Sequence, residues 1–319
     1  MSTHGIVLVA RQEIRTRLRT GRWQILLAVW FGLVNGLALL FRISLESGSG
    51  SNVGWGSEAA VIMFGAVLMS VLVLTLMITP ALSATTINGD RERGTLATLQ
   101  VTRLTGAEIA LGKLVASWGT GLVILGLALP SVFLPVIEGA ITMGRFVVVV
   151  VVTGLLIGIV CALSQGWSAL VARSITSMLL SYLTVFGLLV GTPIAFVLAL
   201  PLTSQPAGDD HLSYRKDHPE YVWWLLAPNP LVVLADAAPT LPEPDERADE
   251  PDDPLGDIGR SVRDSRDPEF TGDDEKTLAN AVWPYGLAFD LALASGAVWL
   301  SARRLRAPAH TLPKGIRVA

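Results

Sequence analysis

The sequence has 319 residues, of which 51% are hydrophobic and 16% are charged, whereas about 25% of the residues of an average soluble domain are charged. This deficit argues against an ordinary soluble protein and indicates a chain that lies in lipid. The formal charge of -3 is unevenly divided: residues 201–282 contain 19 acidic and 7 basic residues, and the rest of the chain has a net charge of +9. The chain is therefore expected to meet two different environments.

Cysteine and histidine usage gives no sign of a metal site. Cys161 is the only cysteine and lies in an apolar run, so it forms no internal disulfide and is interpreted as a small packing residue. The four histidines are scattered over the tails and one loop without ligand spacing. We therefore expect no metal and no metal catalysis.

Six apolar stretches are long enough to cross a bilayer as helices, which takes about 20 residues each. Helices are the open-chain way to span, because lipid offers no partner to an unpaired backbone amide. The stretches are Trp23–Phe41, Ala59–Ile87, Leu114–Ile137, Phe146–Ala172, Ile175–Leu202 and Ala281–Ala302. The predicted fold is an all-α integral membrane protein, with spans 1–5 in residues 23–202 and span 6 in residues 281–302.

The basic residues predict that both termini lie in the cytoplasm. With that orientation, 15 Lys and Arg residues fall on the inner side, in the N-terminal segment, the connections after spans 2 and 4, and the basic tail 303–319. The short outer connections hold only Arg42 and Arg145, as the positive-inside rule requires. We expect a multi-pass protein of the plasma or inner membrane, with residues 203–280 as an extracytoplasmic loop.

Residues 1–22 predict an amphipathic helix on the inner leaflet. An apolar stripe lies next to a basic stripe at helical spacing: Val7, Ala10, Ile14 and Leu18 beside Arg11, Arg15, Arg19 and Arg22. Such arginines can bind anionic lipid headgroups, and the alternative is that they only set the topology. The membrane context disfavours nucleic-acid binding.

The long loop divides into two predicted parts. Residues 221–238 are strongly apolar but interrupted by Pro228 and Pro230, which favours an interfacial or re-entrant segment over a seventh span. Residues 239–276 hold six prolines among acidic runs. Because such a stretch buries too little apolar surface to offset its ordering entropy, we expect an acidic disordered insertion.

The connection between spans 2 and 3, residues 88–113, is the most informative segment. Gly94 can end the second helix, and Thr105 with Glu108 has capping-box spacing for the start of the third. A short transverse helix between them would present a rigid surface to a cytoplasmic partner. An ordinary solvated loop is the alternative on spacing alone.

The pattern of this connection resembles the membrane-spanning permease subunit of type-2 ATP-binding-cassette (ABC) exporters, in which an acidic pair, Gly-Thr-Leu, a short helix, a Thr/Pro-rich turn and Gly-Lys follow the second span. The chain shows this arrangement at Asp90, Glu92, Gly94, Thr95, Leu96, Leu99, Thr102, Thr105, Gly112 and Lys113. Two departures are Arg103-Leu104, where a proline is frequent, and the insertion 239–276. The resemblance covers the six-span plan as well.

The resemblance implies that the segment is a coupling helix docked on a separate cytoplasmic ABC ATPase, with a second permease copy or paralogue completing the pathway. The implied coupling residues are Asp90, Glu92, Gly94, Thr95, Leu96, Leu99, Thr102 and Arg103. The chain has no phosphate loop, because Gly106 and Gly112-Lys113 are wrongly spaced and Leu114 replaces the Ser/Thr. ATP and magnesium are thus expected on the partner, with no cofactor on this chain and no enzymatic activity of its own. A non-transporting membrane scaffold or sensor is the alternative.

Asp290 is the one ionisable residue well inside a predicted span. Because a central Asp costs about 2.5 to 3.5 kcal/mol on an insertion scale, we expect it to face the bundle or an aqueous cavity. Its candidate partners there are Asn35, Ser164, Gln165, Ser168 and Ser181. It is interpreted either as a cavity or gate residue or as structural glue between helices.

Overall fold

The computed structural model describes residues 2–18, 21–48, 58–94, 104–207, 214–239, 253–267 and 280–305. The long elements are α1 (Thr3–Leu18), α2 (Gly21–Gly48), α3 (Glu58–Ser83), α6 (Gly106–Ile137), α7 (Met143–Leu170), α8 (Ser174–Phe186), the π-helix η1 (Gly187–Gly191), α9 (Thr192–Thr203) and α12 (Trp283–Arg304). The short ones are α4 (Asn88–Glu92), β1 (Gln205–Ala207), β2 (Tyr214–Lys216), η2 (Pro219–Tyr221), η3 (Trp223–Leu225), α10 (Pro230–Ala237) and α11 (Pro254–Arg266).

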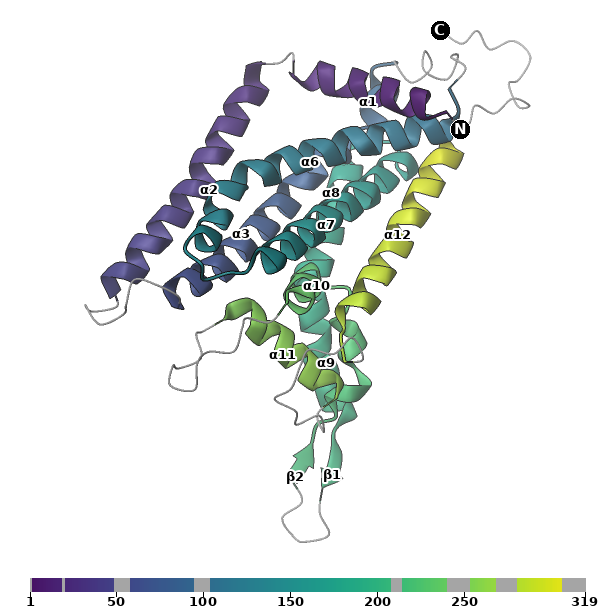
Figure 1. Cartoon of the computed structure of the whole chain (residues 1–319). Coiled ribbons are helices and arrows are strands. Elements are labelled where there is room, and N and C mark those ends of the chain that lie inside the picture. The colour runs from purple at the N-terminus through teal and green to yellow at the C-terminus, as the bar shows by residue number, and fades with distance from the viewer. Residues whose placement is uncertain are drawn as a thin grey trace.

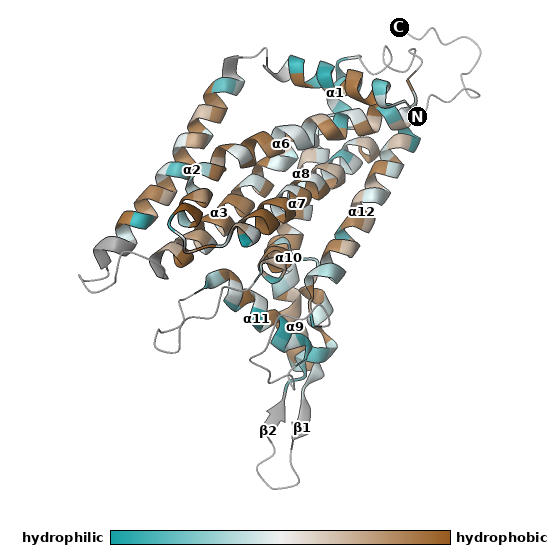
Figure 2. Ribbon diagram, in the orientation of Figure 1, coloured by the Kyte–Doolittle hydropathy of each residue, from teal (hydrophilic) through white to brown (hydrophobic). Residues whose placement is uncertain are grey.

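Among the residues that the structure describes, six helical stretches are long and apolar enough to cross a membrane, which confirms the predicted number of spans. They are Trp23–Ser44, Ala60–Glu92, Gly106–Ile137, Met143–Leu170, Ser174–Thr203 and Trp283–Arg304. In Figure 2 the ribbons of these helices are coloured mostly as hydrophobic residues, and more hydrophilic residues lie on α11 and at the helix ends. The third helix begins at Gly106, before the apolar stretch that starts at Leu114, which confirms the predicted capping box of Thr105 and Glu108.

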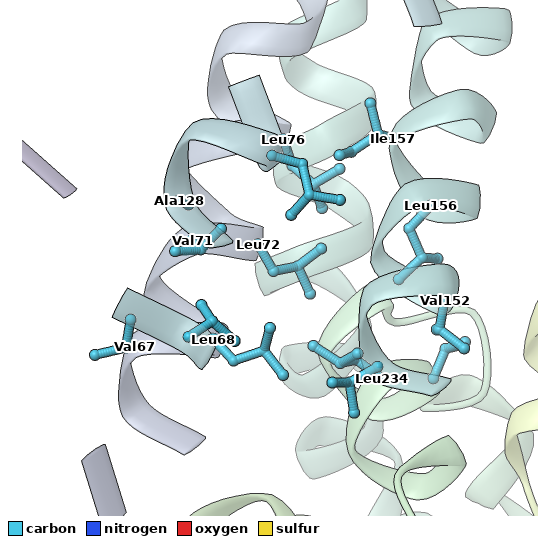
Figure 3. Close-up of a cluster of buried hydrophobic side chains, with 14 of the residues drawn as sticks. Val67, Leu68, Val71, Leu72, Leu76, Ala128, Val152, Leu156, Ile157 and Leu234 are labelled. Carbon is cyan, nitrogen blue, oxygen red and sulfur yellow. The ribbon is translucent and has the colours of Figure 1, made fainter. Parts of the chain in front are cut away.

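The apolar core lies between α3, α6 and α7 and also includes α10 (Figure 3). Leu68, Leu72 and Leu76 recur on one face of α3, at the spacing of one helical turn, and are fully buried. Leu234 of α10 belongs to the same buried cluster. The segment that follows span 5 therefore packs into the bundle.

The bundle has two ends, which we name here. The terminal end carries α1, α4, the first turn of α6 and the last turns of α7 and α12; the hairpin end carries α10, α11 and the ribbon β1–β2 (Figure 1). The ribbon is a short antiparallel pair with Pro206 opposite Arg215, and its two strands are the non-helical elements among those that the structure describes. The start of α1 and the end of α12 both lie at the terminal end, as an even number of spans requires.

Span 5 is interrupted where α8 gives way to η1 and α9. Pro193 has no N–H to donate to the carbonyl of Leu189 four residues earlier. Asn229, which caps α10, donates to that carbonyl (3.0 Å) and to Thr192 Oγ1 (2.9 Å). The break in span 5 is thus bonded to the start of α10.

The prediction of disorder over 239–276 is wrong for residues 253–267, which form α11 and the residues next to it. The composition of this stretch gave the wrong prediction because the helix is held by arginine contacts as well as by apolar burial. Arg263 pairs with Asp236, and Arg266 donates to the carbonyl of Ala281 (2.7 Å) and lies over the Trp223 ring. The other residues of 239–276, apart from 239 itself, lie outside the described part of the chain.

Candidate functional site

The predicted coupling connection begins at the terminal end with α4. This short helix follows α3 after a turn, and its residues Asn88, Gly89 and Asp90 are buried. Gly94 ends it with a φ of +71°, a conformation that L side chains rarely adopt. The expected transverse helix and its residues Thr95, Leu96, Leu99, Thr102 and Arg103 lie outside the described residues.

Lys113 is the centre of a polar cluster that joins three elements. Its side chain is 2% exposed, and its Nζ lies 2.5 Å from Asp90 Oδ2 of α4. The same nitrogen donates to the carbonyl of Thr86 (3.0 Å) and to Glu13 Oε2 of α1 (3.4 Å). We call Glu13, Asp90 and Lys113 the lysine cluster. Because a buried ammonium needs such partners, the cluster fixes α1 and α4 to the third span.

A second set of contacts bonds α4 to the fourth and fifth spans. Ser168 Oγ of α7 accepts the backbone N–H groups of Ile87 and Asn88, both at 3.1 Å. Glu92 accepts the backbone N–H (3.1 Å) and the hydroxyl (2.7 Å) of Ser174, the first residue of α8. A carboxylate at the first turn of a helix is also favoured by the helix dipole. α4 is therefore bonded to spans 3, 4 and 5.

Helix α1 lies directly on α6. Val9 approaches Gly112 so closely that a Cβ at Gly112 would be 2.6 Å from Val9 Cβ, so only glycine permits this contact. Glu108 of α6 accepts the backbone N–H of Ser2 (2.5 Å) and that of Thr105 (2.8 Å). The Gly112-Lys113 pair thus has two structural uses: close approach of α1 and the lysine cluster.

The exposed surfaces next to this cluster are basic and apolar. Arg91, Glu92, Arg93 and Gly94 are exposed at the end of α4. On α1 the buried face differs from the expected apolar stripe, because Val9 is buried against α6 while Val7 is exposed; Ala10 of the stripe is buried. Of the basic stripe, Arg11 and Arg15 are exposed on α1, Arg19 lies outside the described residues, and the Arg22 side chain is likewise not described.

Asp290 lies on α12 and faces the interior of the bundle, as expected; it is 1% exposed. Neither carboxylate oxygen has a hydrogen-bond partner among the described residues, so the expected bond is not formed. Four of its five candidate partners bond elsewhere: Asn35 to Leu127 O, Gln165 to Ala110 O, Ser168 to the backbone before α4, and Ser181 to Ser177 O.

Sequence reasoning missed Glu13 and assigned Lys113 to the family pattern without a partner. The signal available was a lysine at the start of an apolar span, which requires a carboxylate or carbonyl nearby. Asp90 is one of the coupling residues that the resemblance implies; its carboxylate lies 2.5 Å from Lys113 Nζ and 3.2 Å from Arg93. The arrangement bonds α1 to the third span and α4 to the third, fourth and fifth spans.

No protein-family model matches the sequence, and no curated protein matches it at a significant level.

Proposed function

We propose that the chain is the permease subunit of a type-2 ABC exporter, coupled at its terminal end to a separate cytoplasmic ATPase. The observation that carries the proposal is the lysine cluster, which roots the short helix α4 in the third span while leaving Arg91 and Arg93 exposed. A rigid helix with exposed charges is suited to pair with a cytoplasmic partner. Motion of α4 would be transmitted to the spans through its bonds to Lys113, Ser168 and Ser174.

The six-span plan agrees with this role. The fifth and first spans are the least buried: 11% and 17% of their apolar stretches, respectively, are buried inside the bundle. These faces can contact lipid or a second permease copy, and a pathway between two copies is part of the proposal. The terminal end is assigned to the cytoplasm and the hairpin end to the outside, because the basic residues Arg91, Arg93, Arg303 and Arg304 gather at the former.

Site-directed crosslinking tests the proposed partner. Arg91→Cys carries a photoactivatable maleimide in membranes of the native host, where the buried Cys161 reacts little. We expect crosslinking to a protein that contains ATP-binding-cassette motifs. The matched control is Ser261→Cys on the exposed side of α11, which is expected to capture no ATPase.

Two outcomes contradict the proposal. Labelling of Arg91→Cys by an impermeant reagent from outside the cell would reverse the assigned orientation. Crosslinks that never include an ATPase, together with a purified chain that works without nucleotide, would favour the scaffold or sensor. Gly94→Pro adds a functional check: proline holds φ near about -65° where the helix end needs a positive φ, so we expect transport-linked ATPase activity to fall while membrane insertion persists.

A further inference from the structure

Helix α11 crosses the hairpin end and contacts several elements that are far apart in the sequence. At its start, Pro254 and Leu255 pack on Gly65 of α3, where a Cβ would be 3.1 Å from Leu255 Cδ1. At its end, Arg266 donates to the Ala281 carbonyl that precedes α12 and stacks on Tyr285, 4.9 Å from the ring centroid. The helix therefore bridges the second and sixth spans.

The start of α11 is held by a buried ion pair with the fourth span. Arg145 Nη2 lies 2.7 and 2.6 Å from the two carboxylate oxygens of Asp253, and the arginine is fully buried. Its Nε and Nη1 have no hydrogen-bond partner among the described residues. The guanidinium is thus desolvated but only partly satisfied.

Such a pair has a particular energetic character. Desolvation of two charges roughly cancels their attraction, and buried donors without partners add a further penalty. When α11 moves away, water can hydrate both charges and satisfy the two free donors. The docked and undocked states therefore differ little in the free energy contributed by this contact, although loss of one partner would strongly disfavour the docked state.

The remaining contact surface of α11 also allows close docking. Gly259 approaches α10 so closely that a Cβ would be 3.1 Å from the carbonyl oxygen of Ala235. Arg263 binds Asp236, whose other oxygen accepts the N–H groups of Val282 and Trp283 at the start of α12, both at 2.7 Å. α11 thus packs against the structure that holds α10 and α12 together.

We infer that α11 is a reversible latch across the hairpin end, docked in this structure and governed by the buried Arg145–Asp253 pair. The latch is a property of the isolated chain. Only its use in opening a transport pathway rests on the proposed function, so the two statements are tested separately.

Thiol accessibility in the purified full chain tests the latch without any ATPase. The probe is Leu255→Cys, fully buried under the docked helix; native Cys161, also buried, reports unfolding. In the parent we expect slow maleimide labelling at residue 255. In Asp253→Asn and in Arg145→Met we expect the rate to rise at least about tenfold, because one buried charge or polar group loses its partner.

The double variant Arg145→Met with Asp253→Leu separates a latch from a simple stabilising contact. Removing both charges leaves an apolar contact in the docked state, so labelling at residue 255 should return to the parent rate or fall below it. The matched control is Asp257→Asn, which breaks the exposed pair with Arg260 on the solvent side of α11 and should change nothing.

Each other result overturns the inference. Fast labelling of Leu255→Cys in the parent would mean that α11 is not docked. Unchanged labelling in both single variants would mean that the ion pair does not govern docking. Labelling of Cys161 together with residue 255, counted from the intact mass, would show that the pair stabilises the whole fold instead.

Discussion

Lys113 and Asp90 form a buried ion pair, 2.5 Å between Nζ and Oδ2, that connects the third span to the short helix after the second. The pair is not isolated, since Lys113 also donates to the Thr86 carbonyl and to Glu13. Because all partners come from different elements, the ammonium position depends on α1, α4 and α6 together. This makes Lys113 the residue whose loss should affect the terminal end most.

We expect Lys113→Met to lower the free energy of unfolding by about 3–5 kcal/mol, because it leaves Asp90 as a largely buried carboxylate without its main partner. Tryptophan fluorescence during thermal unfolding in detergent measures this loss. Arg93→Met is the matched control: its side chain is 69% exposed and pairs with the same Asp90, so it should cost about 1 kcal/mol or less. Equal losses in the two variants would contradict the central position of Lys113.

Glu92 should be needed for coupling rather than for stability. Its carboxylate is exposed and accepts two hydrogen bonds from Ser174, so solvent screens this interaction and Glu92→Ala should change the free energy of unfolding little. With the proposed ATPase bound in proteoliposomes, we expect transport-linked ATPase activity to drop because α4 is no longer fixed to α8. Ser174→Ala keeps the N–H but removes the hydroxyl and should give a smaller drop. Wild-type activity in both variants would refute the role.

The fold could be predicted from sequence where one physical rule dominates. The six spans follow from apolar length, and the start of α6 follows from the capping box at Thr105 and Glu108. Helix α11 could not be predicted, because its anchors are tertiary: Asp253 meets Arg145 more than a hundred residues away. Composition rules read such charges as solvated and have no access to their partners.

Only part of the candidate site could be predicted, because its other features also depend on tertiary contacts. Gly94 ends a helix as its residue type suggests. The use of Asp90 was not predictable, because the sequence gives its charge but not the direction of its side chain. The contacts of Lys113 were not predictable either, because they require the packing of α1 on α6. That packing depends on the contact between Val9 and Gly112.

Asp290 offers a test of structural glue against a cavity role. Since neither oxygen has a partner among the described residues, Asp290→Leu should leave the free energy of unfolding unchanged or raise it by about 1–3 kcal/mol. Asp290→Asn keeps size and polarity and should leave protein abundance unchanged. If the residue lines a pathway, both variants alter export. A clear loss of abundance or thermal stability in Asp290→Leu would instead identify it as glue.

Asn229 and Pro193 should behave as a coupled pair. Asn229→Ala removes the cap of α10 and leaves the Leu189 carbonyl without its donor, so we expect a loss of about 2–4 kcal/mol in unfolding free energy. Pro193→Ala in that background restores an N–H four residues after Leu189 and should recover part of the loss. The measurement is a double-mutant cycle by thermal unfolding, with Thr203→Ala at the end of α9 as a control outside the break. Strictly additive effects would mean that Asn229 does not compensate for the missing proline N–H.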